Sequence, residues 1–180
     1  MGNKLDRIVC LDCELTCWPD KKERGDQRSE IIQIGICSLN VSTKTISQEK
    51  SYYIKPKYSS ISNYCTALTG ITKQTLKGAI PLSDACNSIM KTYGTRNRPI
   101  ACFGNDTRAF REDCILKCAE YPFSRKIIDV SLWAHLKYFI GGNHSLEECL
   151  SVAGLRFEGQ KHNAVWDSYN TGKLLIKLID

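Results

Sequence analysis

The stretch IVCLDCELTCW at residues 8–18 carries two carboxylates inside an otherwise apolar run. Ile8 and Leu11 belong to a pattern that predicts a buried strand, and side chains two residues apart on a strand point to the same face. Asp12 and Glu14 therefore share one face of an apolar element. Because burying an unpaired carboxylate is costly, the rest of the chain must supply a cation, a proton or open water there.

The hydrophobic pattern predicts strands in the first third of the chain and helices afterwards. Alternating apolar residues favour three successive strands, at residues 6–15, 29–39 and 45–55, paired as an antiparallel meander. Helical spacing, terminal glycines, a proline start and a capping box indicate the later helices. The expected helices cover residues 60–71, 81–93, 106–121, 131–139, 145–155 and 163–180, and two short strands cover residues 99–104 and 126–130.

This order of elements predicts an α/β fold. We expect a five-stranded mixed sheet, with three antiparallel strands and then two parallel ones, flanked by helices. The charged residues 19–28 are expected to form a loop. Binding sites in such sheets gather at strand ends near the point where the strand order reverses, and the first strand would be central. Asp12 and Glu14 therefore lie where a crevice is expected.

Length and composition favour one domain over residues 1–180, since 42% hydrophobic residues are enough for one full core. We expect no signal peptide and no membrane span, because no apolar run is long enough. We also expect no lipid anchor, because Asp6 stands where a myristoylation signal at Gly2 would have Ser or Thr. Ten cysteines would suggest disulfides in a secreted protein. Because no signal peptide is expected, we expect a cytoplasmic protein with reduced thiols. The net charge of +6 favours an anionic partner, although solubility explains it as well.

Closely spaced cysteines raise the alternative of a zinc site. Cys10, Cys13 and Cys17 lie near the start of the chain, and Cys114 and Cys118 lie on an expected helix. The first two would face opposite sides of one strand, and the later pair has the spacing of core-packing residues. Structural zinc sites use tighter pairs of ligands, so zinc is the less favoured interpretation.

Three further polar residues stand at the ends of expected elements. Asp106 follows an apolar strand at the mouth of a helix, where the ordinary role of Asp is an N-terminal cap. His162 and Asp167 are five residues apart and do not share a helical face, so His162 is expected in the loop before the last helix. Each residue alone fits a capping or solvated position.

Taken together, these residues resemble the motif set of the DEDDh, or DnaQ-like, 3′–5′ exonucleases. The residues that carry the resemblance are Asp12, Glu14, Asp106, His162 and Asp167. The segments DCELTCW, SEIIQIGI, LTGIT, FEGQKH and HNAVWDSYN support it, and the likeness spans residues 8–175. Within the family, the chain is similar to the branch of KapD-like bacterial proteins and of histone-mRNA and small-RNA exonucleases. The resemblance implies an RNase H-like fold.

The resemblance also implies two divalent metal ions, Mg²⁺ or Mn²⁺, bound by Asp12, Glu14, Asp106 and Asp167, with His162 as general base. Electrostatics supports such ions, because two like unit charges about 4 Å apart repel by roughly 4 kcal/mol at an effective dielectric constant near 20. Hard oxygen ligands suit both metals. Two ions can activate a water and stabilise a leaving 3′-oxygen at phosphorus, while histidine, with an unperturbed pKa of about 6.5, accepts the proton. The expected products are nucleoside 5′-monophosphates.

Further positions are implied to hold the substrate. Thr16 and the backbone at Leu15 match positions near the terminal 3′-hydroxyl. Tyr64 and Leu68 match positions that stack on the terminal base, an interaction of about 1–3 kcal/mol per base, with core packing as the alternative. Relatives often carry an aromatic residue where this chain has Asn105, which leaves a preference for RNA open.

We therefore expect a metal-dependent 3′–5′ exonuclease that acts on the 3′ ends of single-stranded RNA or DNA, with RNA or short oligonucleotides favoured. The alternatives are a DNA-specific proofreading or repair exonuclease, and a nucleic-acid-binding regulator that kept the fold without turnover. Longer substrates would contact basic side chains near the motifs, unless these are only solvated surface. The candidates are Lys21, Lys22, Arg24, Arg108, Arg111 and Lys161.

Overall fold

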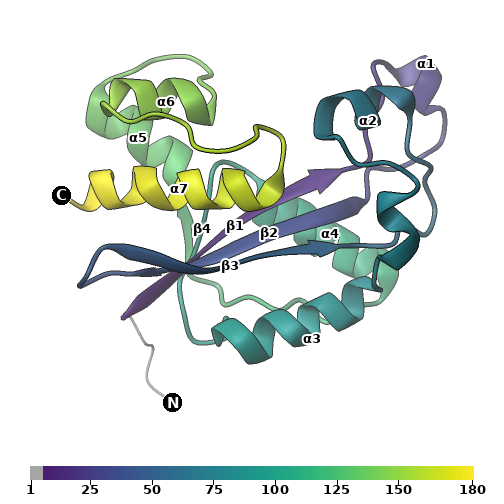
Figure 1. The fold of residues 1–180 in the computed structure, drawn as a ribbon, viewed down its shortest axis with the longest axis horizontal. Helices are drawn as coiled ribbons and strands as arrows, with labels where there is room; N and C mark the ends of the chain where they lie inside the picture. Colours follow the sequence, from purple (N-terminus) through teal and green to yellow (C-terminus); the bar gives the residue numbers. More distant parts are fainter. Residues whose placement is uncertain (1–5) are drawn as a thin grey trace.

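A five-stranded mixed sheet lies at the centre of the computed structural model, which describes residues 6–180 (Figure 1). Residues 1–5, and with them the question of a lipid anchor at Gly2, lie outside the described part. The strands are β1 (Arg7–Leu15), β2 (Ile31–Asn40), β3 (Thr45–Tyr53), β4 (Ile100–Cys102) and β5 (Ile127–Asp129). Their order is β3-β2-β1-β4-β5; β1 pairs antiparallel with β2 and β2 with β3, while β4 runs parallel to both β1 and β5. This confirms the predicted sheet and its central first strand.

Helices cover both faces of this sheet. They are α1 (Lys21–Arg24), α2 (Asn63–Thr69), the 3₁₀ helix η1 (Thr75–Gly78), α3 (Leu82–Tyr93), α4 (Asp106–Lys117), α5 (Val130–Tyr138), α6 (Leu146–Val152) and α7 (Ala164–Ile179). The short α1 interrupts the expected loop, because the Asp20 side chain accepts a hydrogen bond from the Glu23 amide and caps it. The expected helix at 106–121 ends earlier, because Cys118 takes a left-handed backbone conformation with φ of 53°. None of the described helices has both the length and the apolar composition that crossing a bilayer requires.

Alternation along β1 sends its side chains into two separate cores. Val9, Leu11 and Cys13 pack in the cluster that contains residues of α3 and α4. Ile8 and Cys10 pack in the cluster that contains residues of α5, α6 and α7. Asp12 and Glu14 continue the second set, so the strand directs both carboxylates toward the face that α7 covers.

The start of α7 lies directly on β2. A Cβ atom at Gly35 would be 1.9 Å from the carbonyl carbon and oxygen of Ala164, and Gly35 is the ladder partner of Asp12. The buried Gln33 side chain fastens the same turn: its Nε2 donates to Asn163 Oδ1 at 3.2 Å, and its Oε1 accepts from the Ala164 amide at 3.2 Å. Gly35, which has no side chain, and the amide group of Gln33 thus position α7 beside the acids of β1.

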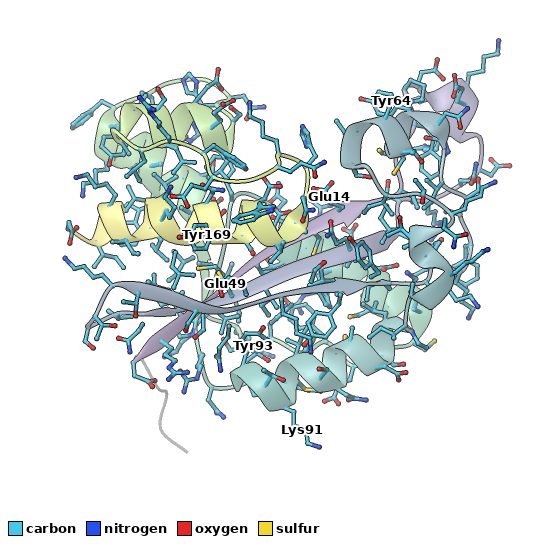
Figure 2. All side chains as sticks on the ribbon, viewed as in Figure 1. Glu14, Glu49, Tyr64, Lys91, Tyr93 and Tyr169 are labelled. Carbon is cyan, nitrogen blue, oxygen red and sulfur yellow. The ribbon has the colours of Figure 1, made fainter. Side chains whose placement is uncertain are left out.

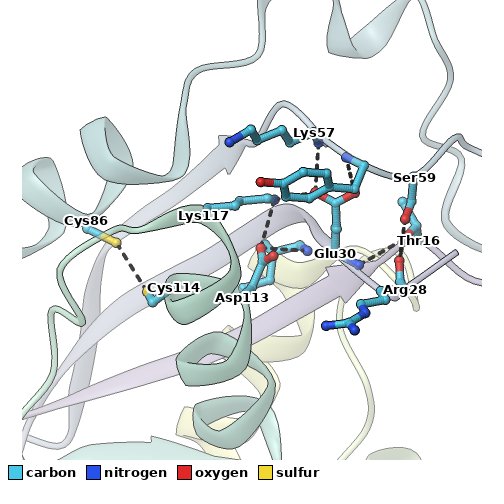
Figure 3. Close-up of polar contacts among 11 residues, drawn as sticks. Thr16, Arg28, Glu30, Lys57, Ser59, Cys86, Asp113, Cys114 and Lys117 are labelled. Atoms are coloured by element: carbon cyan, nitrogen blue, oxygen red, sulfur yellow. Dashed lines mark hydrogen bonds and ion pairs between the residues drawn. The ribbon is translucent and has the colours of Figure 1, made fainter.

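A buried ionic network holds the beginning of β2 against α4 (Figure 3). Lys117 Nζ lies 3.2 Å from Glu30 Oε1 and 2.9 Å from Asp113 Oδ2, and all three side chains are almost fully buried. Glu30 also accepts hydrogen bonds from the amides of Lys57 at 2.7 Å and Tyr58 at 2.8 Å. Burial alone would raise the pKa of Glu30, but these amides and Lys117 outweigh it, and the pKa is lowered. The network therefore ties three segments together and binds both oxygens of Glu30, whereas burial still raises the pKa of Asp113.

We expect Gly35→Ala to destabilise the fold by about 2–4 kcal/mol, because the new methyl group would overlap the backbone of α7 and force the helix away. Urea denaturation followed by circular dichroism measures the change. Gly78→Ala is the matched control, since nothing lies within 4 Å of a Cβ there. Equal stabilities of the two variants would show that the α7 contact on β2 does not carry this energy.

Candidate active site

Carboxylates from two elements meet at the end of β1. Asp12 and Glu14 come from β1 and Asp167 from the first turn of α7, and each offers an oxygen within 4.8 Å of the others. Figure 2 shows Glu14 between the end of β1 and the beginning of α7. The structure thus brings together residues separated by more than 150 positions in the sequence.

Asp106 approaches this group from a third element. It is the first residue of α4, which three residues separate from β4, the parallel neighbour of β1. It is not one of the three residues that share the 4.8 Å separation, yet its charge raises the pKa of Asp12 and of Glu14. The N-cap of α4 is Asn105, which is exposed and makes no capping hydrogen bond through its side chain. Asp106 therefore stands inside the helix and faces the other acids instead of serving as its cap.

All four carboxyl groups have a raised pKa, so each keeps its proton to a higher pH than an isolated carboxyl does. Burial, followed by the charges of Asp106, Asp167 and Glu14, raises the pKa of Asp12 well above its ordinary value. Burial and neighbouring charges raise the pKa of Glu14 to about 7. Burial also raises the pKa of Asp106 to about 7 and that of Asp167 to about 6, although backbone amides partly oppose both shifts. No basic side chain contributes to any of these shifts.

This donor set fits a divalent cation. Carboxylate oxygens are hard ligands, and their close spacing leaves a concentration of negative charge that a cation would neutralise. Among the described residues 6–180, no comparable group of three cysteines or histidines is present. Cys10, Cys13 and Cys114 are buried in the two cores, so the zinc alternative receives no support.

His162 lies in the turn before α7. Its side chain is exposed, and its backbone has a left-handed φ of 57°. The backbone amides of Asn163 and His162 lower the pKa of Asp167, and the first of them donates to Asp167 Oδ2 at 3.0 Å. The turn therefore joins His162 to the acid cluster through its backbone, and its place before α7 is the one that the spacing of the two residues predicts.

Two of the expected substrate positions present apolar surface to solvent. Tyr64 is 45% exposed and Leu68 36% exposed, and they lie one turn apart on α2. Figure 2 shows Tyr64 on α2, on the same side of the sheet end as Glu14. Core packing, the alternative interpretation, does not account for either side chain.

Thr16 has a different environment. It is fully buried; its Oγ1 accepts from the Glu30 amide at 2.9 Å and donates to the Arg28 carbonyl at 3.3 Å. The Thr16 side chain thus connects the end of β1 to residues 28–30, directly before β2. Leu15 is partly buried, and its carbonyl accepts a weak hydrogen bond from Cys65 Sγ at 3.6 Å. That bond connects the end of β1 to α2.

The expected basic contacts are partly occupied within the protein. Arg108 pairs with Glu112 at 2.9 Å, Arg111 lies 4.4 Å over the ring of Tyr121, and Lys161 pairs with Glu147. The residues that sequence reasoning missed are Gln33 and Gly35, which set the position of α7. Gln33 and Gly35 stand at alternate positions of an otherwise apolar strand, and this pattern could have indicated a close contact on that face.

Comparisons with known proteins agree on one family. A family model described as an exonuclease, RNase_T, matches residues 9–175. Human ERI1 exoribonuclease 2 is 28% identical over 97% of this chain, which spans 28% of that protein. The 3′-5′ exonuclease Snipper of Drosophila melanogaster is 28% identical over 96% of this chain and 69% of its own length. The nuclease domain of 3′hExo, a DEDDh family member bound to rAMP, superposes with a TM-score of 0.88 at 23% identity, covering 99% of this chain and 94% of that one. The RNase H-like DEDDh fold is thereby confirmed.

We expect Glu14→Gln to stabilise the metal-free protein at pH 8. The unfolded carboxyl loses its proton near pH 4.5 and the folded one near pH 7, so the folded state is penalised increasingly between these values and fully above pH 7. At about 1.4 kcal/mol per pKa unit, removing the charge should raise the free energy of unfolding by roughly 1–3 kcal/mol.

Urea denaturation in EDTA at pH 8 and at pH 4.5 measures this difference. The stabilisation should nearly vanish at pH 4.5, where the folded carboxyl is protonated and the unfolded one is half protonated. Glu49→Gln, at an exposed carboxyl on β3, is the control and should change little at either pH. A gain that is the same at both pH values would contradict the electrostatic explanation.

Proposed function

The chain belongs to the RNase_T exonuclease family, and we propose that it is a metal-dependent 3′–5′ exonuclease for single-stranded nucleic acid, with RNA or short oligonucleotides favoured. The observation that carries the proposal is the convergence of buried, mutually repelling carboxylates at the end of β1. Names of the relatives, exoribonuclease and 3′-5′ exonuclease, support the direction and the substrate class. The chain spans only 28% of the length of human ERI1 exoribonuclease 2.

Two divalent ions, Mg²⁺ or Mn²⁺, would be held by Asp12, Glu14, Asp106 and Asp167. When bound, such ions neutralise the carboxylates, activate the attacking water and stabilise the leaving 3′-oxygen. The protein's own contribution is to keep the four side chains in place before the ions arrive, through β1, β4 and the α7 contact at Gly35. Preorganisation of this kind avoids reorganisation during the reaction.

His162 would be the general base. An imidazole nitrogen accepts the proton of the attacking water, the water oxygen bonds to phosphorus, and the 3′-oxygen of the preceding nucleotide leaves. The products are a nucleoside 5′-monophosphate and a strand shortened by one nucleotide. The exposed position of His162 beside Asp167 supports this role, because a base that exchanges protons with water must reach solvent.

The terminal base would stack on Tyr64 and Leu68, which are exposed on α2. Because every base has an apolar face, such a platform accepts any sequence. Asn105, exposed beside Asp106, would border the terminal nucleotide on the other side without an aromatic ring. The backbone at Leu15 and Thr16 would approach the terminal 3′-hydroxyl, with the buried Thr16 hydroxyl acting as a brace.

We place the whole of residues 1–180 in one exonuclease domain, a proposal that the family match over residues 9–175 supports. A cytoplasmic location is supported by the state of the cysteines, since all ten are free thiols.

We expect Asp12→Asn to abolish nuclease activity, with a loss of at least 1,000-fold in kcat, while the fold is retained. The assay uses matched RNA and DNA single strands labelled at the 5′ end, with Mg²⁺ or Mn²⁺, and follows the ladder of shortened products. Asp84→Asn, at an exposed acid on α3, is the control and should keep full activity. EDTA should stop the wild-type reaction without unfolding the protein.

Each alternative gives its own result in this assay. A ladder from DNA alone would identify a DNA-specific exonuclease and overturn the RNA preference. Binding of both strands without shortening would identify a catalytically idle regulator. Activity that is unchanged in a purified Asp12→Asn preparation would remove the assignment of the acids.

We expect Tyr64→Ala to raise KM by about 5- to 100-fold for short oligonucleotides, because the stack on the terminal base is lost. Tyr58→Ala is the matched control, since Tyr58 is also exposed, at 53%, and lies outside α2. Steady-state kinetics on a substrate with an abasic 3′-terminal residue completes the test. The wild type and Tyr64→Ala should handle that substrate equally; a persistent difference would mean that Tyr64 acts on something other than the base.

A further inference from the structure

A second pocket lies on the protein between the edge strand β3 and α7, apart from the acid cluster. Its volume is about 390 Å³, and it is lined by Glu49, Glu158, Val165, Trp166 and Tyr169. Figure 2 shows Tyr169 on α7 and Glu49 on β3 facing each other. Trp166 and Asp167 are neighbours in the sequence, but successive side chains on a helix diverge by about 100°, so the pocket and the acids occupy different sides of α7.

Two aromatic rings form perpendicular walls of this pocket. The ring centroids of Trp166 and Tyr169 are 6.1 Å apart and their planes meet at 86°. Trp166 is 40% exposed, yet its ring is held from behind, because a Cβ at Gly159 would lie 2.1 Å from it. The glycine lets the loop before α7 press directly on the indole. The rings are therefore fixed in place while one face of the indole stays open.

Carboxylates complete the pocket. Glu49 is exposed and forms no ion pair with any residue of 6–180, whereas Glu158 pairs with Lys173. Burial, and then the charges of Glu158 and Glu49, raise the pKa of Tyr169, which places both carboxylates near its hydroxyl. With one carboxylate neutralised by Lys173, the pocket keeps one net negative charge in a chain whose formal net charge is +6.

We propose that this pocket binds the lysine or arginine side chain of a protein partner. Aromatic faces attract cations through their quadrupoles, and an adjacent carboxylate adds a charged acceptor. The same carboxylates repel phosphate, so the pocket disfavours the nucleic acid that the acid cluster is suited to hydrolyse. At about 390 Å³ it is at the small end of ligand sites and has room for one long basic side chain.

The position of the pocket favours a protein as the source of the cation. β3 is an edge strand of the sheet, and Glu49 projects from it, so an extended segment of a partner can run along this edge while it inserts one basic side chain. The interaction would give the exonuclease a protein contact that leaves the catalytic opening free.

Binding is tested on the full chain by two-dimensional ¹H–¹⁵N NMR, in which the indole N–H signal of each tryptophan is resolved. The probes are n-butylguanidinium, n-butylammonium and, as a neutral match, n-pentanol, followed by a ten-residue Gly/Ser peptide with a central Arg, Lys or norleucine. We expect the Trp166 signal to shift with both cations and with the Arg and Lys peptides, and to stay in place with n-pentanol and the norleucine peptide.

Two variants and one control localise the effect. Trp166→Leu, in which binding is read from the backbone amide signal of Tyr169, should weaken cation binding about tenfold, and Glu49→Gln should weaken it about threefold with nuclease activity retained. Trp133→Leu, at a tryptophan that is 37% exposed on α5, should change nothing. Equal binding of neutral and cationic probes, or cation binding that survives Trp166→Leu, would overturn the proposal. So would binding of the free cations without any binding of the Arg and Lys peptides, because a small metabolite would then be the ligand.

Discussion

Repulsion among carboxylates at the end of β1 is the constraint on which the rest of the structure depends. Burial raises the pKa of Asp12, Glu14, Asp106 and Asp167, the charges of neighbouring carboxylates raise that of the first three further, and no basic side chain opposes these shifts. Such a cluster lowers the stability of the metal-free fold, so other contacts must hold it together. The apolar side chains of β1 and the backbone contact of α7 at Gly35 supply that restraint. A bound cation would relieve this destabilisation, so the same repulsion that lowers the stability of the metal-free fold favours cation binding.

A second group of buried acids in the same protein has a lysine at its centre. Glu30 and Asp113 share Lys117, and backbone amides complete the coordination of Glu30 (Figure 3). The pKa of Glu30 is lowered, whereas that of Asp12 is raised well above its ordinary value. Burial acts to raise the pKa of both Glu30 and Asp12, and the difference is that two backbone amides and Lys117 bind the Glu30 carboxylate. Burial still raises the pKa of Asp113 in the same group. The acids at the end of β1 have the chemistry of a site that takes its cation from solution.

The sequence was sufficient for the parts of the fold that depend on local periodicity. Alternation in residues 8–15 predicted that Asp12 and Glu14 share a face, and the sheet confirms the central position of that strand. Contacts between distant segments were not predictable in the same way. The close approach at Gly35 depends on where α7 lands on β2; a glycine in an apolar strand signals a close contact but not the segment that makes it. The short α1 was missed because four residues are too few to show a helical pattern of apolar residues, and only the cap at Asp20 indicates the helix.

The distribution of charge over this protein favours two different partners at two places: nucleic acid at the acid cluster and a basic side chain at the pocket of Trp166 and Tyr169. A formal net charge of +6 favours encounter with nucleic acid in general, yet the acid cluster itself repels phosphate until cations neutralise it. Metal binding would therefore decide when the catalytic opening accepts a phosphodiester. The pocket of Trp166 and Tyr169 has no comparable set of closely spaced carboxylates, and Lys173 already neutralises Glu158. Its negative charge would persist whether or not metal is present, so its preference for a basic side chain is independent of the catalytic state.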